Sequence, residues 1–182
     1  MSKSKSNLIF TDVIFKYNTV FKNNADLQQL AITYPEIFNI ERLVEITMAD
    51  VGGYNYIDGD HCDFDDGSEC KTASVRPSPR GGSSINSYQL EISNVVSTGG
   101  NAKSGAIRVV LYNPHIYKLK YYFLPENAIH KIGINIHPTT KSGRLFATWN
   151  RLTDKCNKLD KFEVDSFETL AKIPYSPTED TK

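Results

Sequence analysis

The sequence predicts a mixed α/β fold, in which a central β-sheet is flanked by helices and includes a hairpin rich in charged residues. Apolar residues recur at helical spacing in residues 36–50, which favours an amphipathic helix. Beyond residue 54, short runs of β-branched and aromatic residues alternate with turn residues, as is typical of strands. The length of 182 residues suits one domain with a sizeable core.

Helices are expected near both ends of this domain. Asp26 can cap a short helix over 27–31, because its carboxylate accepts a first-turn amide hydrogen. The helix over 36–50 should end at Gly52-Gly53. Its apolar positions are Ile37, Ile40, Leu43, Val44 and Met48, and its opposite side carries Glu36, Glu41 and Glu45. A short C-terminal helix is suggested by Phe162, Phe167 and Leu170.

Strands are expected in the middle of the chain. Residues 54–64 and 68–75 are predicted to pair as a hairpin around Asp65-Asp66-Gly67, because these residue types favour a tight turn. The prolines and glycines of 77–84 then predict a flexible loop. Further strands are predicted at 86–96, 106–112, 117–124 and, from alternating isoleucines, within 129–149.

Composition excludes several classes of protein. The mean hydropathy is −0.39, and no apolar run approaches the ~18 residues of a membrane span. Three cysteines are too few for a disulfide scaffold, and the first residues lack a secretory leader, so we expect a cytoplasmic protein. No phosphate-binding glycine loop ending in Lys-Ser/Thr occurs, so no nucleotide cofactor is expected. The predicted units are a flexible N-terminus (1–6), one domain (7–173) and a polar tail (174–182).

Charge is distributed unevenly along the chain. Residues 1–70 carry twelve acidic and five basic side chains, whereas 71–151 carry eleven basic and only two acidic ones. A basic middle segment predicts a polyanionic partner such as nucleic acid. The candidate DNA-binding residues are Arg76, Arg80, Lys103, Lys118, Lys120 and Arg144, and for each the alternative is an ordinary solvated surface position.

The most informative segment is 57–72, which contains six carboxylates and one lysine. Carboxylates that are crowded together repel one another, and a bound cation normally relieves the repulsion. An EF-hand does not fit, because counting from Asp63 puts Gly67 at the fifth position instead of the sixth. Zinc is disfavoured, since His61, Cys62 and Cys70 have no second metal-ligand pair beside them. We expect Asp65 and Asp66 to be solvent-exposed residues of a turn.

The length of the turn decides which side chains meet. If Asp65-Asp66-Gly67 is a three-residue loop, Asp63 lies opposite Glu69, with their Cβ atoms roughly 5 Å apart and Lys71 on the same face. With a loop of two or four residues, the side chains of the first strand would point to the opposite faces, and Asp60 would take the place of Asp63 on the face of Glu69 and Lys71. We favour Asp63 and keep Asp60 as its rival.

Two carboxylates and a lysine on one face suit the hydrolysis of a phosphodiester. Asp63 and Glu69, with Asp60 as the alternative, could hold one or two Mg²⁺ ions, because hard cations prefer oxygen ligands. Such an ion polarises the phosphate and lowers the pKa of a bound water. Lys71 could orient or deprotonate that water, or neutralise developing charge. Glu45 or Glu41 of the preceding helix could complete the metal site.

Asp63 followed by Glu69-Cys70-Lys71 resembles the PD-(D/E)XK signature of the restriction-endonuclease-like nucleases. The resemblance spans residues 41–125, with Cys62 in place of the proline and an Asp-to-Glu spacing of six. It implies a restriction-endonuclease-like core and a catalytic set of Asp63, Glu69 and Lys71. The implied function is a Mg²⁺-dependent, sequence-specific double-stranded DNA endonuclease, most like a small type II restriction enzyme. Such an enzyme would act as a homodimer, because palindromic DNA matches two-fold symmetry.

Two alternatives remain open from the sequence. A DNA-repair or junction-resolving nuclease of the same fold would use the same residues. A non-enzymatic nucleic-acid- or metal-binding module would use the acidic hairpin only to hold an ion. Lys71 distinguishes the second alternative, since a cation site gains nothing from a neighbouring ammonium group whereas a phosphodiesterase does.

Overall fold

The computed structural model describes residues 40–57, 62–77, 87–96, 105–113, 116, 118–129, 131–136 and 143–176. The helix expected over 27–31 lies outside these ranges, as do both predicted chain ends except for 174–176. Among the candidate site residues, Asp60, Arg80 and Lys103 also lie outside them. None of the described helices is long and apolar enough to cross a membrane.

The first sheet is mixed, as the sequence predicts. It is built from β1 (Glu69–Ser74), β4 (Ile107–Asn113), β5 (Lys118–Leu124) and β8 (Glu163–Val164), in that order. Strand β1 runs parallel to β4, and the other pairs are antiparallel. Strand β1 therefore lies at an edge of this sheet.

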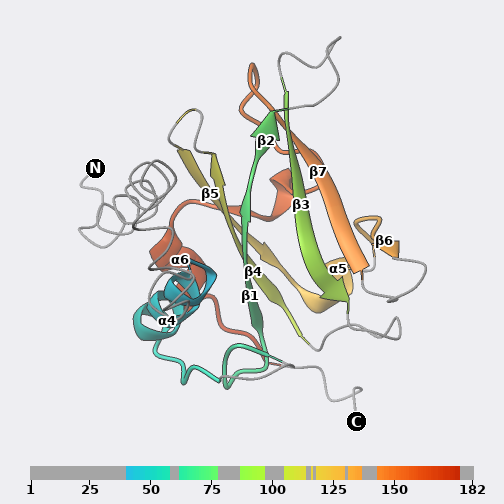
Figure 1. Cartoon of the computed structure of the whole chain (residues 1–182). Coiled ribbons are helices and arrows are strands. Elements are labelled where there is room, and N and C mark those ends of the chain that lie inside the picture. The colour runs from blue at the N-terminus through green and yellow to red at the C-terminus, as the bar shows by residue number, and fades with distance from the viewer. Residues whose placement is uncertain are drawn as a thin grey trace, which may run out of the picture.

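A second sheet packs across the first, so the single central sheet that we expected is wrong. Its strands are β2 (Arg76–Pro77), β3 (Ser87–Val96), β7 (Gly143–Asn150) and β6 (Asn135–Ile136), all antiparallel. Only Val75 separates β1 from β2, so one bent stretch of chain passes from the first sheet to the second (Figure 1).

Two helices cover the other face of the first sheet, where α4 (Ile40–Gly52) lies beside α6 (Phe167–Lys172) (Figure 1). Helix α4 confirms the predicted amphipathic helix and its end, because the amides of Gly53 and Tyr54 both donate to the Ala49 carbonyl. Ser166 caps α6 by accepting from the Thr169 amide. A short helix, α5 (Glu126–Ile129), follows β5.

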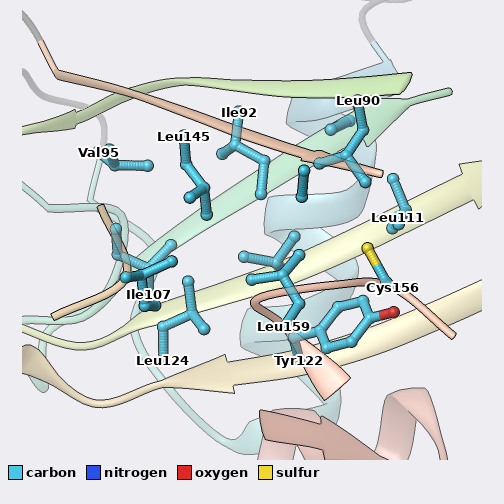
Figure 2. Close-up of a cluster of buried hydrophobic side chains, with 14 of the residues drawn as sticks. Leu90, Ile92, Val95, Ile107, Leu111, Tyr122, Leu124, Leu145, Cys156 and Leu159 are labelled. Atoms are coloured by element: carbon cyan, nitrogen blue, oxygen red, sulfur yellow. The ribbon is translucent and has the colours of Figure 1, made fainter. Parts of the chain in front are cut away.

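The core has two layers, one on each face of the first sheet. Between the sheets, Leu90, Ile92 and Leu145 of the second sheet meet Leu111, Tyr122 and their neighbours (Figure 2). On the helix side, Val44 and Met48 of α4 pack with Val110 and with Phe167 and Leu170 of α6. Strand β4 is buried throughout because both of its faces are covered.

One strand prediction needs correction. The expected hairpin between 54–64 and 68–75 is reduced to its turn, since Tyr56 and Phe64 make one isolated bridge and β1 pairs with β4. A buried apolar partner strand, although distant in sequence, covers more of β1 than the polar 57–63 segment could. The strands expected within 129–149 are confirmed by β6 and β7, and Ile132 packs into the core from a turn.

Candidate active site

The turn before β1 has the three-residue form that the sequence favours. The Gly67 amide donates to the Phe64 carbonyl at 3.0 Å, and the Phe64 amide donates to the Ser68 carbonyl at 3.3 Å. Gly67 has φ +82°, the left-handed conformation that a type I turn with a following bulge requires. This geometry puts Phe64 opposite Ser68 and brings Asp63 next to the start of β1.

Asp63 is held against the exposed edge of β1. Its Oδ2 atom accepts a hydrogen bond of 2.7 Å from the Cys70 amide, and its own amide donates to the Ser68 carbonyl at 3.2 Å. The carboxylate thus occupies a position where a further strand could have paired. A carboxylate that binds a backbone amide is fixed in orientation, which suits a metal ligand.

Glu69 and Lys71 lie two residues apart on β1 and share one of its faces. Their side chains form an ion pair, with the Glu69 side chain 4% exposed and that of Lys71 22% exposed. Burial lowers the pKa of Lys71, but the carboxylates of Glu69 and Asp63 outweigh it, so the net pKa is raised. Lys71 is therefore a cation at neutral pH, which favours charge neutralisation over proton abstraction as its role.

Glu45, on α4, is the helix carboxylate that faces this group. The Tyr56 hydroxyl donates to its Oε2 atom at 3.2 Å, and the Arg42 guanidinium stacks over the Tyr56 ring. Burial and the charge of Asp63 raise the pKa of Glu45, although Tyr56, Lys71 and Arg42 act in the opposite direction. Glu41 is exposed in the first turn of the helix, so Glu45 is the better candidate of the two.

Three carboxylates and one ammonium group therefore gather from α4, the turn and β1. Within the described ranges, no three His, Cys, Asp or Glu side chains are already close enough to hold one metal ion. Mg²⁺ commonly takes only one or two protein carboxylates and completes its octahedron with water and phosphate oxygens. Asp63 and Glu69 are the candidates for these two ligands, and Glu45 is the candidate for a third.

Sequence reasoning missed a buried arginine that anchors the same turn. Arg108 on β4 is fully buried, and its guanidinium contacts Asp66 at 2.9 Å and also the Ser68 hydroxyl. It reaches the Tyr54 hydroxyl and the Ile173 carbonyl, both at 2.8 Å. Asp66 is therefore not the solvated turn residue that we expected. The apolar residues around Arg108 in β4 gave no sign of a charge partner.

The described basic candidates are mostly paired with carboxylates. Lys120 is 5% exposed, lies over the Trp149 ring and contacts Glu163 at 2.7 Å, so a role in contacting DNA is not supported. Lys118 pairs with Asp154, and Arg144 pairs with Glu91 at 3.0 Å; both remain partly exposed. The backbone of Arg76 lies in β2, directly after the strand that carries Lys71.

Comparison with known proteins adds no relative to this picture. The sequence matches no protein-family model, and no curated protein matches it.

Proposed function

We propose that this protein is a Mg²⁺-dependent DNA endonuclease that hydrolyses phosphodiester bonds at the group formed by Glu45, Asp63, Glu69 and Lys71. The observation that carries the proposal is the convergence of these four side chains, which come from a helix, a turn and an edge strand. Crowded, partly buried carboxylates cost free energy without a cation. Such a group of carboxylates beside a lysine supports a site that binds a cation and an anion together.

Each residue has a distinct role in this proposal. Asp63 and Glu69 supply oxygen ligands, and Asp63 is pre-oriented by its bond to the Cys70 amide. Glu45, held by Tyr56, supplies a further ligand or accepts a hydrogen bond from a water ligand. A bound Mg²⁺ would activate water and stabilise charge on the phosphate.

Lys71 favours a nuclease over a simple ion-binding module. Its ammonium group is held next to Glu69 and keeps its charge, which weakens cation binding at the same place. The same charge stabilises the extra negative charge that develops on a phosphate during hydrolysis. If a divalent ion bound Glu69, Lys71 would lose its ion-pair partner and could neutralise negative charge on a substrate phosphate.

The finer assignment follows the resemblance to restriction-type nucleases. We propose double-stranded DNA as the substrate, cleavage at a specific sequence and a homodimer that cuts both strands. A repair or junction-resolving nuclease is the second candidate, because the same site would serve it. Arg76, directly beyond β1, is the described basic residue nearest in sequence to the site.

The test is cleavage of supercoiled plasmid DNA in Mg²⁺, Ca²⁺ or EDTA. We expect wild-type protein to cut in Mg²⁺ alone, and Glu69→Ala and Lys71→Ala each to lose about 100-fold or more in rate. Lys131→Ala is the matched control, because Lys131 is an exposed lysine on a turn remote in sequence from the site. Cleavage by Lys71→Ala at the wild-type rate would contradict the proposal.

A further inference from the structure

The outer face of the second sheet carries a hollow that the proposed nuclease site does not use. It is lined by residues of β3 and β7, whereas the proposed nuclease site lies on β1. Figure 1 shows that β1 belongs to a different sheet from β3 and β7. The residues that line it are Gln89, Leu90, Phe146, Ala147, Thr148, Asn157 and Lys158.

Strand alternation explains which side chains face outward here. Leu90 and Ala147 are paired and buried, and they contribute to the core between the sheets. Their neighbours Gln89, Phe146 and Thr148 therefore project to the outside. Phe146 is 40% exposed, which leaves part of an aromatic ring available in a concave setting.

The turn after β7 forms the polar wall of the hollow. The Asn157 amide donates to the Thr148 carbonyl at 2.9 Å, and the Asn157 Oδ1 atom accepts from the Thr148 amide at 2.6 Å. The carboxamide is fixed through its oxygen, so its Nδ2 group is the end that can donate to a ligand. Lys158 has φ +67°, a conformation that costs a lysine free energy and that glycine would adopt more easily.

The charge of the hollow suits an anion with an aromatic part. None of the lining residues in the described part of the chain is acidic. The carboxylate of Glu91, which pairs with Phe146 across the two strands, is held by Arg144 at 3.0 Å. The Lys158 side chain belongs to an exposed residue, and its ammonium group makes a long contact of 3.4 Å with the Gly133 carbonyl.

We propose that this hollow binds an unpaired nucleotide of single-stranded DNA. Phe146 stacks on the base, because aromatic side chains bind bases of any sequence through their faces. Gln89 donates or accepts hydrogen bonds at the base edge, Asn157 donates one through Nδ2, and Lys158 contacts the phosphate. This binding requires no cleavage and goes beyond the proposed nuclease function.

The test is fluorescence anisotropy with a labelled oligothymidylate of about 12 nucleotides. EDTA is present, so that no divalent ion contributes. We expect Phe146→Ala to weaken binding by about 5- to 100-fold, the range of one lost stacking contact. Leu152→Ala is the matched control, since Leu152 is an apolar residue 76% exposed outside the hollow, and it should bind as wild type does.

Lys158→Gly provides a second variant that should fold, because glycine accepts the positive φ of this position. It should weaken binding and reduce the salt dependence by about one phosphate contact. Equal affinities for wild type, Phe146→Ala and Leu152→Ala would overturn the proposal. So would a dimer that dissociates in Phe146→Ala while the oligonucleotide affinity stays unchanged, because the hollow would then bind a second copy of the chain.

Glu69→Ala separates this proposal from the nuclease function. Unchanged oligonucleotide binding by Glu69→Ala, with loss in Phe146→Ala, would support the hollow whether or not the protein cleaves DNA. Loss of binding in Glu69→Ala alone would place the oligonucleotide at the nuclease site and overturn the proposal.

Discussion

The guanidinium of Arg108 contacts the carboxylate of Asp66 at 2.9 Å, with the arginine side chain completely buried. This pair joins the centre of the first sheet to the turn between Asp63 and Glu69. Because Arg108 also bonds the Ile173 and Leu170 carbonyls, it links that turn to the end of α6. Asp63 and Glu69, the two proposed metal ligands, flank this turn. Their positions therefore depend on Arg108, although none of the hydrogen bonds described for Arg108 reaches either of these carboxylates.

Replacing Arg108 should destabilise the fold strongly. Arg108→Met removes the charged partner of Asp66 and a donor to the Ile173 and Leu170 carbonyls, and breaking one side of a buried pair costs about 3–5 kcal/mol. Urea unfolding followed by circular dichroism measures the loss. Arg144→Met removes a half-exposed pair with Glu91 and should cost less than about 1 kcal/mol. Similar losses for both variants would show that the Arg108 network contributes no special stability.

Glu45, and not Glu41, should matter for cleavage. Glu45→Gln keeps the size of the side chain and a contact with Tyr56 but removes the charge next to Asp63. We expect the cleavage rate in Mg²⁺ to fall by about 10- to 100-fold, as for residues that support a metal site. Glu41→Gln, on the same helix, should cleave as wild type does. Equal cleavage rates for the two variants would contradict a role for Glu45 in the site.

Asp154 should stabilise the fold at neutral pH and lose this effect in acid. Although burial opposes it, hydrogen bonds from Lys118 and the Trp149 indole lower the pKa of Asp154. A carboxyl group with a lowered pKa stabilises the folded state above its unfolded pKa, and the effect disappears as the pH falls through the folded value. Asp154→Asn should therefore cost about 1 kcal/mol at pH 7, where half-exposed charges are screened by solvent.

Urea titrations of wild type and Asp154→Asn at several pH values test this dependence. The two proteins should converge in stability once the pH lies below the folded pKa of Asp154. A difference that stays constant from neutral to strongly acidic pH would assign the effect to packing instead of charge.

The three cysteines should differ in reactivity. Burial raises the pKa of Cys156 to about 12 and raises that of Cys70 well above its usual value. Cys62 is only partly buried, although burial and the nearby carboxylate of Asp63 also raise its pKa. Since the thiolate is the reactive form, Cys62 alone should react with a thiol reagent in the native protein, and faster as the pH rises.

Mass spectrometry after brief labelling measures this directly. Urea-unfolded protein serves as the control and should be labelled at all three positions. Native labelling of Cys156 as fast as Cys62 would contradict the buried position of Cys156 between the sheets.

Local features of the fold were predictable from the sequence because neighbours in the chain determine them. The amphipathic pattern of α4, the β-branched run of β4 and the Asp-Asp-Gly turn all follow from residues only a few positions apart. The same turn geometry predicted that Asp63 lies next to the start of β1, where its carboxylate accepts from the Cys70 amide.

Pairings between distant segments could not be predicted in this way. The parallel pairing of β1 with β4 and the contact of Arg108 with Asp66 join residues about 40 positions apart. Lys120 was misread because its part of β5 is covered: its ammonium group lies over the Trp149 ring and pairs with Glu163, whereas Lys118 at the start of the strand is exposed. A charged residue on a strand indicates solvent only where nothing packs over it.

The central claim, that the carboxylates beside Lys71 bind a divalent cation, is tested most directly by Mn²⁺ binding measured with electron paramagnetic resonance. Mn²⁺ replaces Mg²⁺ because both prefer oxygen ligands. We predict saturable binding to the wild-type protein, and loss of this binding in the Asp63→Asn, Glu69→Gln double variant. Asp65→Asn, an exposed aspartate in the same turn, should bind as wild type does. Equal Mn²⁺ affinity in the wild type and the double variant would contradict the claim.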